Sequence, residues 1–110
     1  MGTLSLKSDK RNLPRISNLD VPCINVSCEQ NASIDPCRII NLSQEGICII
    51  SDNPSAFLLL IPGDRVNIIL EGHIFPAAVA RINRNIAGLW FKEMTKVQSD
   101  YIERIIVTSY

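Results

Sequence analysis

The spacing of apolar residues changes once along this chain of 110 residues, close to its C-terminus. Before that point, apolar residues come in short runs rich in Val and Ile, separated by clusters of Gly, Pro, Asn, Asp and Ser, which is typical of strands joined by turns. After it, apolar residues recur every three to four positions, which predicts one amphipathic helix. Its apolar positions are Val97, Tyr101, Ile102, Ile105 and Ile106. The pattern indicates a small β-structure with one helix packed against it.

The turn signals divide the first part of the chain into six or seven short segments. The expected strands cover residues 20–28, 36–43, 46–51, 65–70, 74–82 and 86–93, and residues 56–61 form a buried segment that is either a strand or a helical turn. Val66, Ile68 and Leu70 should share one face of their strand, and Leu89 and Phe91 should share one face of theirs, with Trp90 and Lys92 on the other. Pro76 has no backbone N–H, so its strand should lie at an edge or carry a bulge. We therefore expect a mainly β fold, a small split antiparallel barrel of six or seven strands with the C-terminal α-helix packed outside.

Both ends of the expected domain have sequence signals. Thr95 and Gln98 can form a capping box, which predicts a helix over residues 96–108. Residues 1–10 lack apolar periodicity and are expected to be a flexible N-terminal arm, so the barrel domain would cover residues 11–110. Four cations, Lys7, Lys10, Arg11 and Arg15, give the start of the chain a positive charge, which a solvated tail would also show.

The overall charge excludes several classes of function. Eleven basic and eleven acidic residues cancel, whereas general nucleic-acid and membrane binders depend on excess positive charge. A barrel that binds oligonucleotides would also need aromatic stacking platforms, and aromatic residues make up only 5% of the chain. No apolar run is long enough to cross a bilayer, and no signal peptide is evident. We expect a cytoplasmic protein that binds neither DNA nor RNA and does not insert into membranes.

The four cysteines and the single histidine do not form a recognisable chemical site. Cys23, Cys28, Cys37 and Cys48 contain no C-x-x-C pair, and His73 is distant from them in sequence. We expect no metal site or cofactor, and reduced thiols on strands. A metal-dependent phosphodiesterase would need clusters of carboxylates and histidines, and a cysteine nucleophile would need a base and an orienting group. The sequence therefore indicates a protein without enzymatic activity.

Two short motifs carry binding chemistry. Arg11 and Arg15 form an R-x-x-x-R pair, and after 25 intervening residues Asn41, Ser43 and Gly46 form N-x-S-x-x-G. An arginine fork matches the O6 and N7 acceptors of guanine or neutralises a phosphate. The polar pair of the second motif lies two residues apart on an expected strand, so both side chains should point outward, with Ile40 and Leu42 on the other face.

Each motif taken alone also has an ordinary structural explanation. A charged face often produces R-x-x-x-R, and a hairpin turn often contains Asn, Ser and Gly. In the second motif, Gly46 would allow a positive φ in the turn and a close approach of ligand to backbone. Lys10 can add a phosphate contact or be solvated, and Arg81 is expected more often at the surface than at the ligand. Trp90 is expected to pack beneath the terminal helix rather than beside the ligand.

The two motifs occur together, in this order and at this separation, on a β-rich chain that ends in a helix. This combination resembles the PilZ domain family, whose members are bacterial receptors for cyclic di-GMP. The resemblance covers nearly the whole chain and implies the barrel fold and a ligand site made by five residues. Those residues are Arg11, Arg15, Asn41, Ser43 and Gly46. The first position of the second motif is often Asp in the family, and Asn41 offers one carbonyl oxygen and no charge.

The resemblance also implies a role in signalling. We expect the chain to bind cyclic di-GMP, to order its N-terminal arm on binding, and to present the changed surface to a protein partner. That partner would belong, by the resemblance, to motility, biofilm or exopolysaccharide machinery. The alternative is a PilZ-like adaptor that contacts proteins without binding the nucleotide, against which the intact arginine pair argues.

Overall fold

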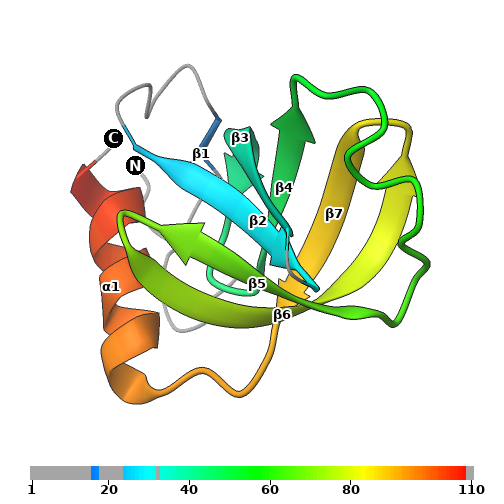
Figure 1. Cartoon of the computed structure of the whole chain (residues 1–110). Coiled ribbons are helices and arrows are strands. Elements are labelled where there is room, and N and C mark those ends of the chain that lie inside the picture. The colour runs from blue at the N-terminus through cyan, green and yellow to red at the C-terminus, as the bar shows by residue number, and fades with distance from the viewer. Residues whose placement is uncertain (1–15, 18–23, 32, 109–110) are drawn as a thin grey trace.

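The protein is a six-stranded antiparallel β-barrel with a short additional strand and one C-terminal helix (Figure 1). The computed structural model describes residues 16–17, 24–31 and 33–108. Its strands are β1 (Ile16–Ser17), β2 (Val26–Gln30), β3 (Ser33–Leu42), β4 (Gly46–Ser51), β5 (Arg65–Leu70), β6 (His73–Asn83) and β7 (Ile86–Phe91), and its helix is α1 (Lys96–Thr108). The barrel and the outside helix confirm the fold expected from the sequence, and the helix has the expected bounds.

The barrel closes because β3 pairs with strands on both of its edges. The strand order is β1-β3-β2-β5-β6-β7-β4, and a further pairing of β3 with β4 completes the ring. Strand β6 therefore lies between β5 and β7 and is not an edge strand, but it carries a bulge between Val79 and Arg81, which is the second of the two alternatives expected for the strand of Pro76. The carbonyl oxygen of Pro76 accepts a hydrogen bond from the backbone N–H of Lys92, which follows the last residue of β7. The missing N–H of Pro76 thus falls at the end of the ladder between β6 and β7, where its absence removes little hydrogen bonding.

Strand β3 is long enough to share one edge between two partners. Its first half pairs with β2, up to Cys37 opposite Val26, and its last two residues pair with β1, where Ile16 lies opposite Leu42. The sequence did not predict β1, because a strand of two residues is too short to show an alternating pattern. This pairing fixes the point at which the chain enters the barrel, next to the end of β3.

The core lies inside the barrel and beneath the helix. Alternate residues of β5 and β7 are buried, as period-2 patterning requires, whereas β4 is buried at nearly every position. The largest fully buried apolar side chains are Phe57, Phe75, Ile39, Leu42, Ile49, Ile68, Leu70, Ile102 and Ile106. In β7, Leu89 and Phe91 face inward while Trp90 is exposed, which confirms the alternation expected for that strand.

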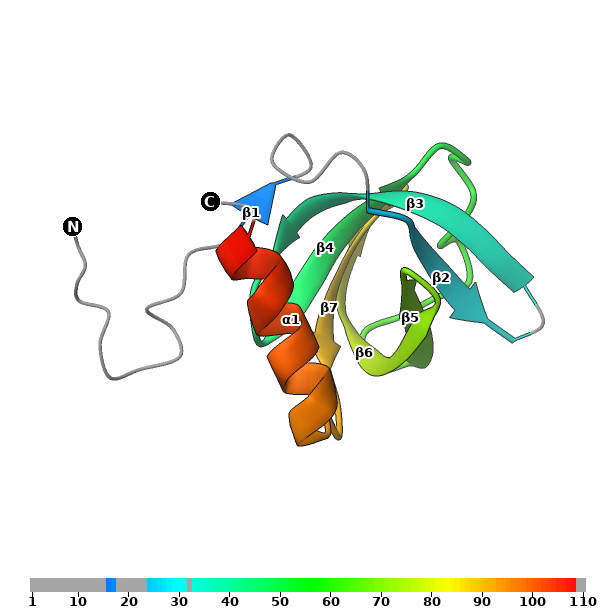
Figure 2. The ribbon, with the colours of Figure 1, turned by 90° about the vertical axis from the view of Figure 1, so that its left-hand side faces the viewer.

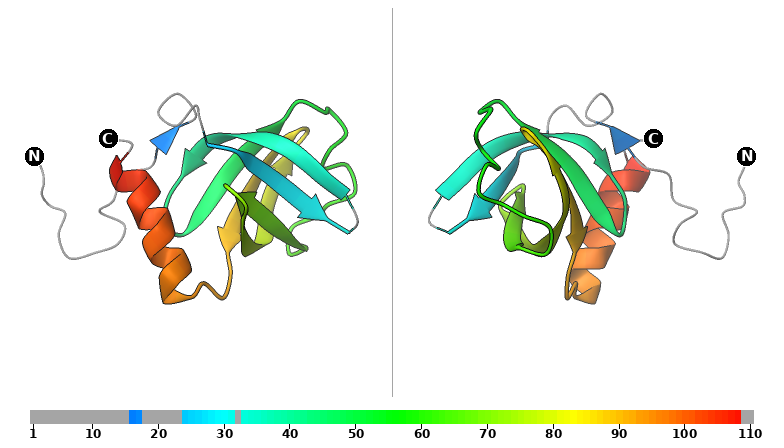
Figure 3. Two further views of the ribbon diagram at one scale, coloured as in Figure 1. Left: turned by 60° about the vertical axis from the view of Figure 1, so that its left-hand side comes forward. Right: turned by 90° about the vertical axis from the view of Figure 1, so that its right-hand side faces the viewer.

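Helix α1 begins with the expected capping box and packs outside the barrel at one end of it (Figures 2 and 3). The hydroxyl oxygen of Thr95 accepts the backbone N–H of Gln98 at 3.1 Å, and the side-chain oxygen of Gln98 accepts the backbone N–H of Thr95 at 3.0 Å. The ring of Tyr101 contacts Phe75 and His73 on β6, with centroids 5.8 and 4.7 Å apart. In the described part of the chain, no helix is long and apolar enough to cross a membrane.

The connection between β4 and β5 departs from expectation. Residues 56–61 form successive turns, and only part of the segment is buried. Ala56 and Phe57 enter the core, but Leu58, Leu59 and Ile61 are exposed. A turn directs its side chains to more than one side, so an apolar run in a turn cannot be buried along its whole length. The prediction of a buried segment is therefore wrong for these three residues.

Candidate functional site

The second sequence motif forms the end of β3, the β3–β4 turn and the start of β4. The backbone N–H of Ser43 donates to the carbonyl oxygen of Gly46 at 2.9 Å and closes the turn. The hydroxyl oxygen of Ser43 accepts the N–H of Glu45 at 3.3 Å and donates to the carbonyl of Gly46 at 3.4 Å. The serine thus shapes the hairpin, and the second lone pair of its hydroxyl oxygen stays available to a hydrogen-bond donor.

Two β-bulges decide which side chains face outward near this turn. The extra residue is Ile40 in β3 and Ala80 in β6, because the register of each strand shifts at that point. A bulge resets the alternation of side chains by one residue. Without it, strict alternation from buried Ile39 and buried Val79 would have turned Asn41 and Arg81 into the core. The expected outward direction of the second motif is confirmed, although Ile40 lies in the bulge.

The bulges align four residues in one row across the outer face of the barrel. Asn41 on β3 lies opposite Cys48 on β4, Cys48 lies opposite Gly88 on β7, and Gly88 lies opposite Arg81 on β6. Directly opposed residues in an antiparallel sheet point to the same face. An amide and a guanidinium that are 40 positions apart in sequence therefore face the same patch of surface, with Cys48 and Gly88 between them.

Gly88 gives the Arg81 side chain its path across the sheet. A Cβ atom built on Gly88 would lie 3.2 Å from Cγ and 3.4 Å from Nε of Arg81. The aliphatic part of the arginine therefore occupies the space that any other residue at position 88 would fill. With the described residues, Arg81 forms no ion pair or side-chain hydrogen bond, so its donors are available to a ligand.

Gly46 is required for a different reason from the one the sequence suggested. Among the described glycines, positive φ occurs at Gly63 and Gly72, so the expectation of a positive φ at Gly46 is wrong. A Cβ on Gly46 would instead overlap the carbonyl oxygen of Leu89 and lie 3.3 Å from the ring of Trp90. The absent side chain lets β4 approach β7 closely and leaves the indole beside the turn.

These residues surround a hollow of about 120 Å³ on the outer face of β3, β4, β7 and β6. Its lining residues are Asn41, Ser43, Gly46, Ile47, Cys48, Ala80, Arg81, Gly88, Leu89 and Trp90. Arg81 is the one charged residue in this lining. The hollow thus combines an amide, a hydroxyl, a guanidinium and an exposed indole, which can hydrogen-bond a polar edge, neutralise an anion and stack on a flat ring.

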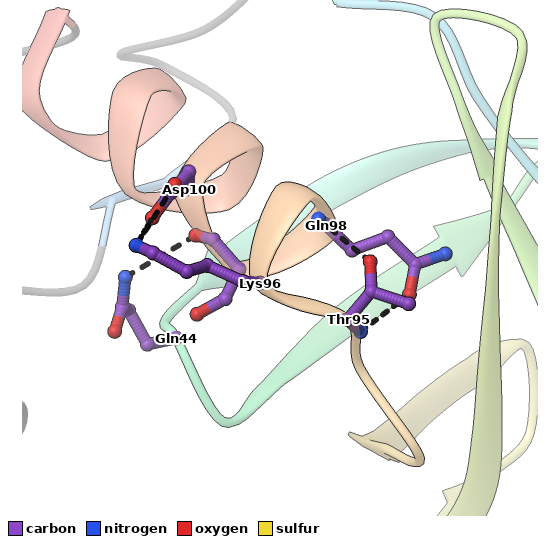
Figure 4. A network of polar contacts seen from close by, with 6 residues as sticks. Gln44, Thr95, Lys96, Gln98 and Asp100 are labelled. Atoms are coloured by element: carbon purple, nitrogen blue, oxygen red, sulfur yellow. Dashed lines mark hydrogen bonds and ion pairs between the residues drawn. The ribbon is translucent and has the colours of Figure 1, made fainter.

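A second hollow, of about 740 Å³, lies between the β3–β4 turn and the start of α1. It shares Trp90 with the first, and Figure 4 shows the polar contacts along it. The side-chain amide of Gln44 donates to the carbonyl oxygen of Ser99 at 3.5 Å, and Lys96 pairs with Asp100 at 3.3 Å. The Gln44 contact connects the motif turn directly to the helix.

The first comparison with known proteins concerns the family. The PilZ domain model matches residues 9–108. The chain belongs to the PilZ family. PilZ domains are non-catalytic cyclic di-GMP receptors, in agreement with the expectation that the chain is not an enzyme.

Solved PilZ structures have the same fold. The chain is similar to the PilZ domain with c-di-GMP of YcgR from Escherichia coli, with a TM-score of 0.69 and 18% identity over 86% of each chain. It is similar to the PilZ domain of CeSA from a cellulose-synthesizing bacterium, with a TM-score of 0.61 and 20% identity, covering 86% of this chain and 96% of that one. It also covers 43% of full YcgR from Escherichia coli in complex with c-di-GMP, at a TM-score of 0.60 and 19% identity over 86% of this chain. Curated proteins gave no significant match.

The structure brings together only part of the predicted PilZ site. Asn41, Ser43 and Gly46 line one hollow. Arg11 and Arg15, together with Lys10, lie outside the described residues, so the first motif stays a prediction.

Two further residues of the hollow were assigned other roles by the sequence. Arg81 was interpreted as a surface charge, and Trp90 was expected to pack beneath the helix. Trp90 instead is 47% exposed and lines both hollows. A glycine inside a strand indicates that another group approaches closely, and the alternation of β7 places Gly88 on the outer face with Trp90. The sequence alone could not show that this group is Arg81, because that requires the register between β6 and β7.

Cys28 and Cys37 are not placed as reactive thiols. Burial raises the pKa of Cys28 to about 12, and the pKa of Cys37 to about 12, with smaller contributions from Asp35. A thiol with such a pKa stays protonated at neutral pH and is a poor nucleophile. No group of three or more His, Cys, Asp or Glu residues is placed to hold a metal ion within the described ranges. Cys23 lies outside the described residues.

Proposed function

We propose that this PilZ protein is a cytoplasmic receptor for cyclic di-GMP and that one guanine of the ligand binds over the hollow between Asn41 and Arg81. The observation that carries the proposal is the row that places these two side chains on one face, with no charged residue other than Arg81 in the lining. A single cation there favours an anionic ligand, and the amide provides both a donor and an acceptor.

Each group in the hollow has a distinct part in recognition. The carbonyl oxygen of Asn41 can accept a hydrogen bond from the N1 or N2 hydrogens of guanine. The fork of Arg81 matches its O6 and N7 acceptors or a phosphate oxygen. Trp90 offers an exposed ring face for stacking, and Ser43 offers its second lone pair. Because Asn41 is uncharged, its hydrogen bond should be weaker than that of the Asp found in many relatives.

The hollow is too small to hold a whole dinucleotide. Its volume of about 120 Å³ lies below the roughly 300–1,000 Å³ of ordinary ligand pockets. The remaining contacts are assigned to Arg11 and Arg15. The pairing of β1 with β3 supports this assignment. Ile16, which follows Arg15, lies opposite Leu42, which precedes Ser43. The first motif is therefore joined to the barrel beside the second.

We further propose that residues 1–10 act as a flexible arm of the barrel domain, residues 11–110, and become ordered when the ligand binds. A ligand shifts a conformational equilibrium only by its different affinity for the two states. Arg11 and Arg15 would provide that difference by contacting the ligand in one state only. The ordered arm would then be recognised by a protein partner in motility, biofilm or exopolysaccharide machinery. The competing proposal is an adaptor that contacts proteins without the nucleotide.

Calorimetric titration of the purified chain with cyclic di-GMP tests the proposal. The expected result is binding that falls more than tenfold for Arg15→Ala and about fivefold for Asn41→Ala, whose uncharged hydrogen bond contributes roughly 1 kcal/mol. Loss of a charged hydrogen bond costs roughly 1.5–3 kcal/mol, and about 1.4 kcal/mol corresponds to tenfold. The matched control is Arg38→Ala, since Arg38 lies on the same strand as Asn41 but pairs with Asp52 at 3.1 Å. Parent protein that is folded yet gives no heat at millimolar ligand would favour the adaptor.

Two further measurements separate the parts of the proposal. Cyclic di-AMP presents an amine where guanine has O6, so it should bind at least tenfold more weakly. Equal affinity for the two ligands would contradict guanine recognition. Hydrogen exchange across residues 6–16, with and without saturating cyclic di-GMP, tests the arm. Unchanged protection there, with binding intact, would reject arm ordering alone.

A further inference from the structure

The connection between β4 and β5, residues 52–64, displays large apolar side chains to solvent. Leu58 is 76% exposed, Leu59 is 85% exposed and Ile61 is 64% exposed. Single exposed apolar residues are common on protein surfaces, but three within four positions make a local patch, which is typical of an interaction site. We call these three residues the loop patch. Figure 1 shows the connection as a long excursion at the side of the barrel.

The loop patch is displayed on an ordered backbone. Turn hydrogen bonds run from the N–H of Ala56, Leu58 and Leu60 to carbonyl oxygens three positions earlier, at 3.1 to 3.2 Å. Asp64 accepts the N–H of Ile61 at 3.0 Å, and Gln30 on β2 donates to the carbonyl of Ala56 at 2.7 Å. An ordered loop loses little conformational entropy when it binds.

The fold does not require apolar side chains at the loop patch. Phe57, which is 1% exposed, anchors the connection in the core, and Leu60 packs partly against it. The three patch residues point away from these anchors and have negative φ values, which most residues adopt. Polar residues could adopt the same backbone conformation, so the folding of the described residues does not explain why the patch is apolar.

Charge near the patch excludes a membrane as its occupant. Between positions 52 and 64 the only charged residues are Asp52 and Asp64. Asp52 pairs with Arg38 at 3.1 Å, and Asp64 is used within the loop. Loops that bind bilayers add Lys or Arg, which attract anionic headgroups. Arg65, which directly follows the connection, pairs with Glu93 at 2.8 Å, so neither it nor Arg38 is an unpaired cation that would attract headgroups to the patch.

The small number of residues in the patch argues against a second copy of this chain as its occupant. A stable dimer buries roughly 800 Å² on each partner, from about 20–30 residues. Three side chains on one projecting loop supply only a small part of that, and two projecting loops cannot enclose each other. A concave surface, in contrast, covers such side chains on several sides and buries most of their area.

We propose that Leu58, Leu59 and Ile61 bind in an apolar groove of a partner protein. The site is separate from the nucleotide hollow and does not depend on nucleotide binding. Strand β4 runs from Gly46 at the hollow to Ser51 at the start of the loop, a distance of roughly 16 Å at the usual rise per residue. The partner can therefore be bound while the hollow is occupied.

The first step of the test locates what contacts the patch. The chain is produced in its own cells with the photo-crosslinker p-benzoylphenylalanine in place of Leu59 or, as control, of Val97. Val97 lies at the start of α1 and is 76% exposed, like Leu58. We expect a discrete adduct from position 59 that disappears when Leu58→Ser and Ile61→Ser are added, and no such adduct from position 97.

The second step measures direct binding. The partner identified in the adduct is purified and titrated with the full chain. Leu58→Ser combined with Leu59→Ser should weaken binding at least tenfold, while Val97→Ser should leave it unchanged. Thermal unfolding of both variants must match the parent, which shows that lost binding is not lost folding.

Five outcomes overturn the proposal. Two of them are adducts, either between two copies of the chain or within one chain. A third is co-sedimentation with vesicles of phosphatidylethanolamine and phosphatidylglycerol that is lost when the patch is changed. A fourth is binding of the purified partner that the double variant leaves unchanged. Absence of any adduct at position 59 overturns it as well. None of these results affects the cyclic di-GMP proposal, which calorimetry tests independently.

Discussion

The nucleotide hollow and the loop patch expose functional groups in opposite ways. At the hollow, side chains are absent where the sheet would otherwise be covered, at Gly46 and Gly88, and polar side chains of Asn41, Ser43 and Arg81 line the space. At the loop patch, large apolar side chains are added to a turn whose own anchor, Phe57, is fully buried. The hollow makes room for a ligand to enter, whereas the patch itself would enter a partner.

The difference has a consequence for how each region tolerates change. The hollow is part of the sheet, so its residues are also neighbours of backbone and side chains that hold the barrel together. The patch residues contribute little to packing, because their side chains are mostly exposed to solvent. Where a residue of the hollow packs against backbone, as Gly46 does, substitution should affect stability as well as binding, while substitutions at the patch should affect binding alone.

The largest effect is expected within the loop itself, at its anchor. Phe57→Ala removes a fully buried ring and should lower the free energy of unfolding by about 3–5 kcal/mol. Urea denaturation of the variant and the parent measures the change. A loss below about 1 kcal/mol would mean that the connection is held by its hydrogen bonds rather than by Phe57.

The next effect concerns the closest approach of two strands at the hollow. Gly46→Ala adds a Cβ against the carbonyl oxygen of Leu89, which belongs to the backbone and cannot rotate away. We expect a loss of about 2–3 kcal/mol, as for other overpacked sites. Thermal and urea unfolding measure it. If the variant were as stable as the parent, strands β4 and β7 would have to be further apart than described.

Gly88→Ala is the matched substitution on the neighbouring strand and should behave differently. Its Cβ would meet the flexible side chain of Arg81 at 3.2 Å, which can move. We expect stability within about 1 kcal/mol of the parent but cyclic di-GMP affinity lowered about fivefold, since roughly 1 kcal/mol of a charged contact would be lost. Calorimetry gives the affinity. Unchanged affinity would show that the position of Arg81 is irrelevant to the ligand.

The smallest effect on stability is expected at the loop patch. Leu59→Ser replaces the most exposed of the patch side chains and should change the free energy of unfolding by less than about 0.5 kcal/mol in either direction. Urea denaturation beside Phe57→Ala makes the comparison within one loop. A loss comparable to that of Phe57→Ala would mean that Leu59 is packed, and it would remove the basis of the docking proposal.

Much of the fold followed from local sequence patterns. The capping pair Thr95 and Gln98 marks the start of α1, because both partners lie within one turn and the hydrogen bonds need nothing else. The alternating residues of β5 and β7 predicted strands whose inner and outer faces are confirmed. The motif Asn41, Ser43 and Gly46 was placed correctly on a hairpin whose polar residues face outward.

The sequence by itself thus determined most of the elements, the inner and outer faces of β5 and β7, and the hairpin that carries the second motif, since each depends on residues a few positions apart. Tertiary structure alone decided that Arg81 faces the same hollow as Asn41, because the bulges at Ile40 and Ala80 and the register of four strands are long-range properties. It also decided that Leu58 is exposed while Phe57 is buried. Hydrophobic character states which side chains gain from burial, but only the packing of the whole barrel determines which of them have a place inside it.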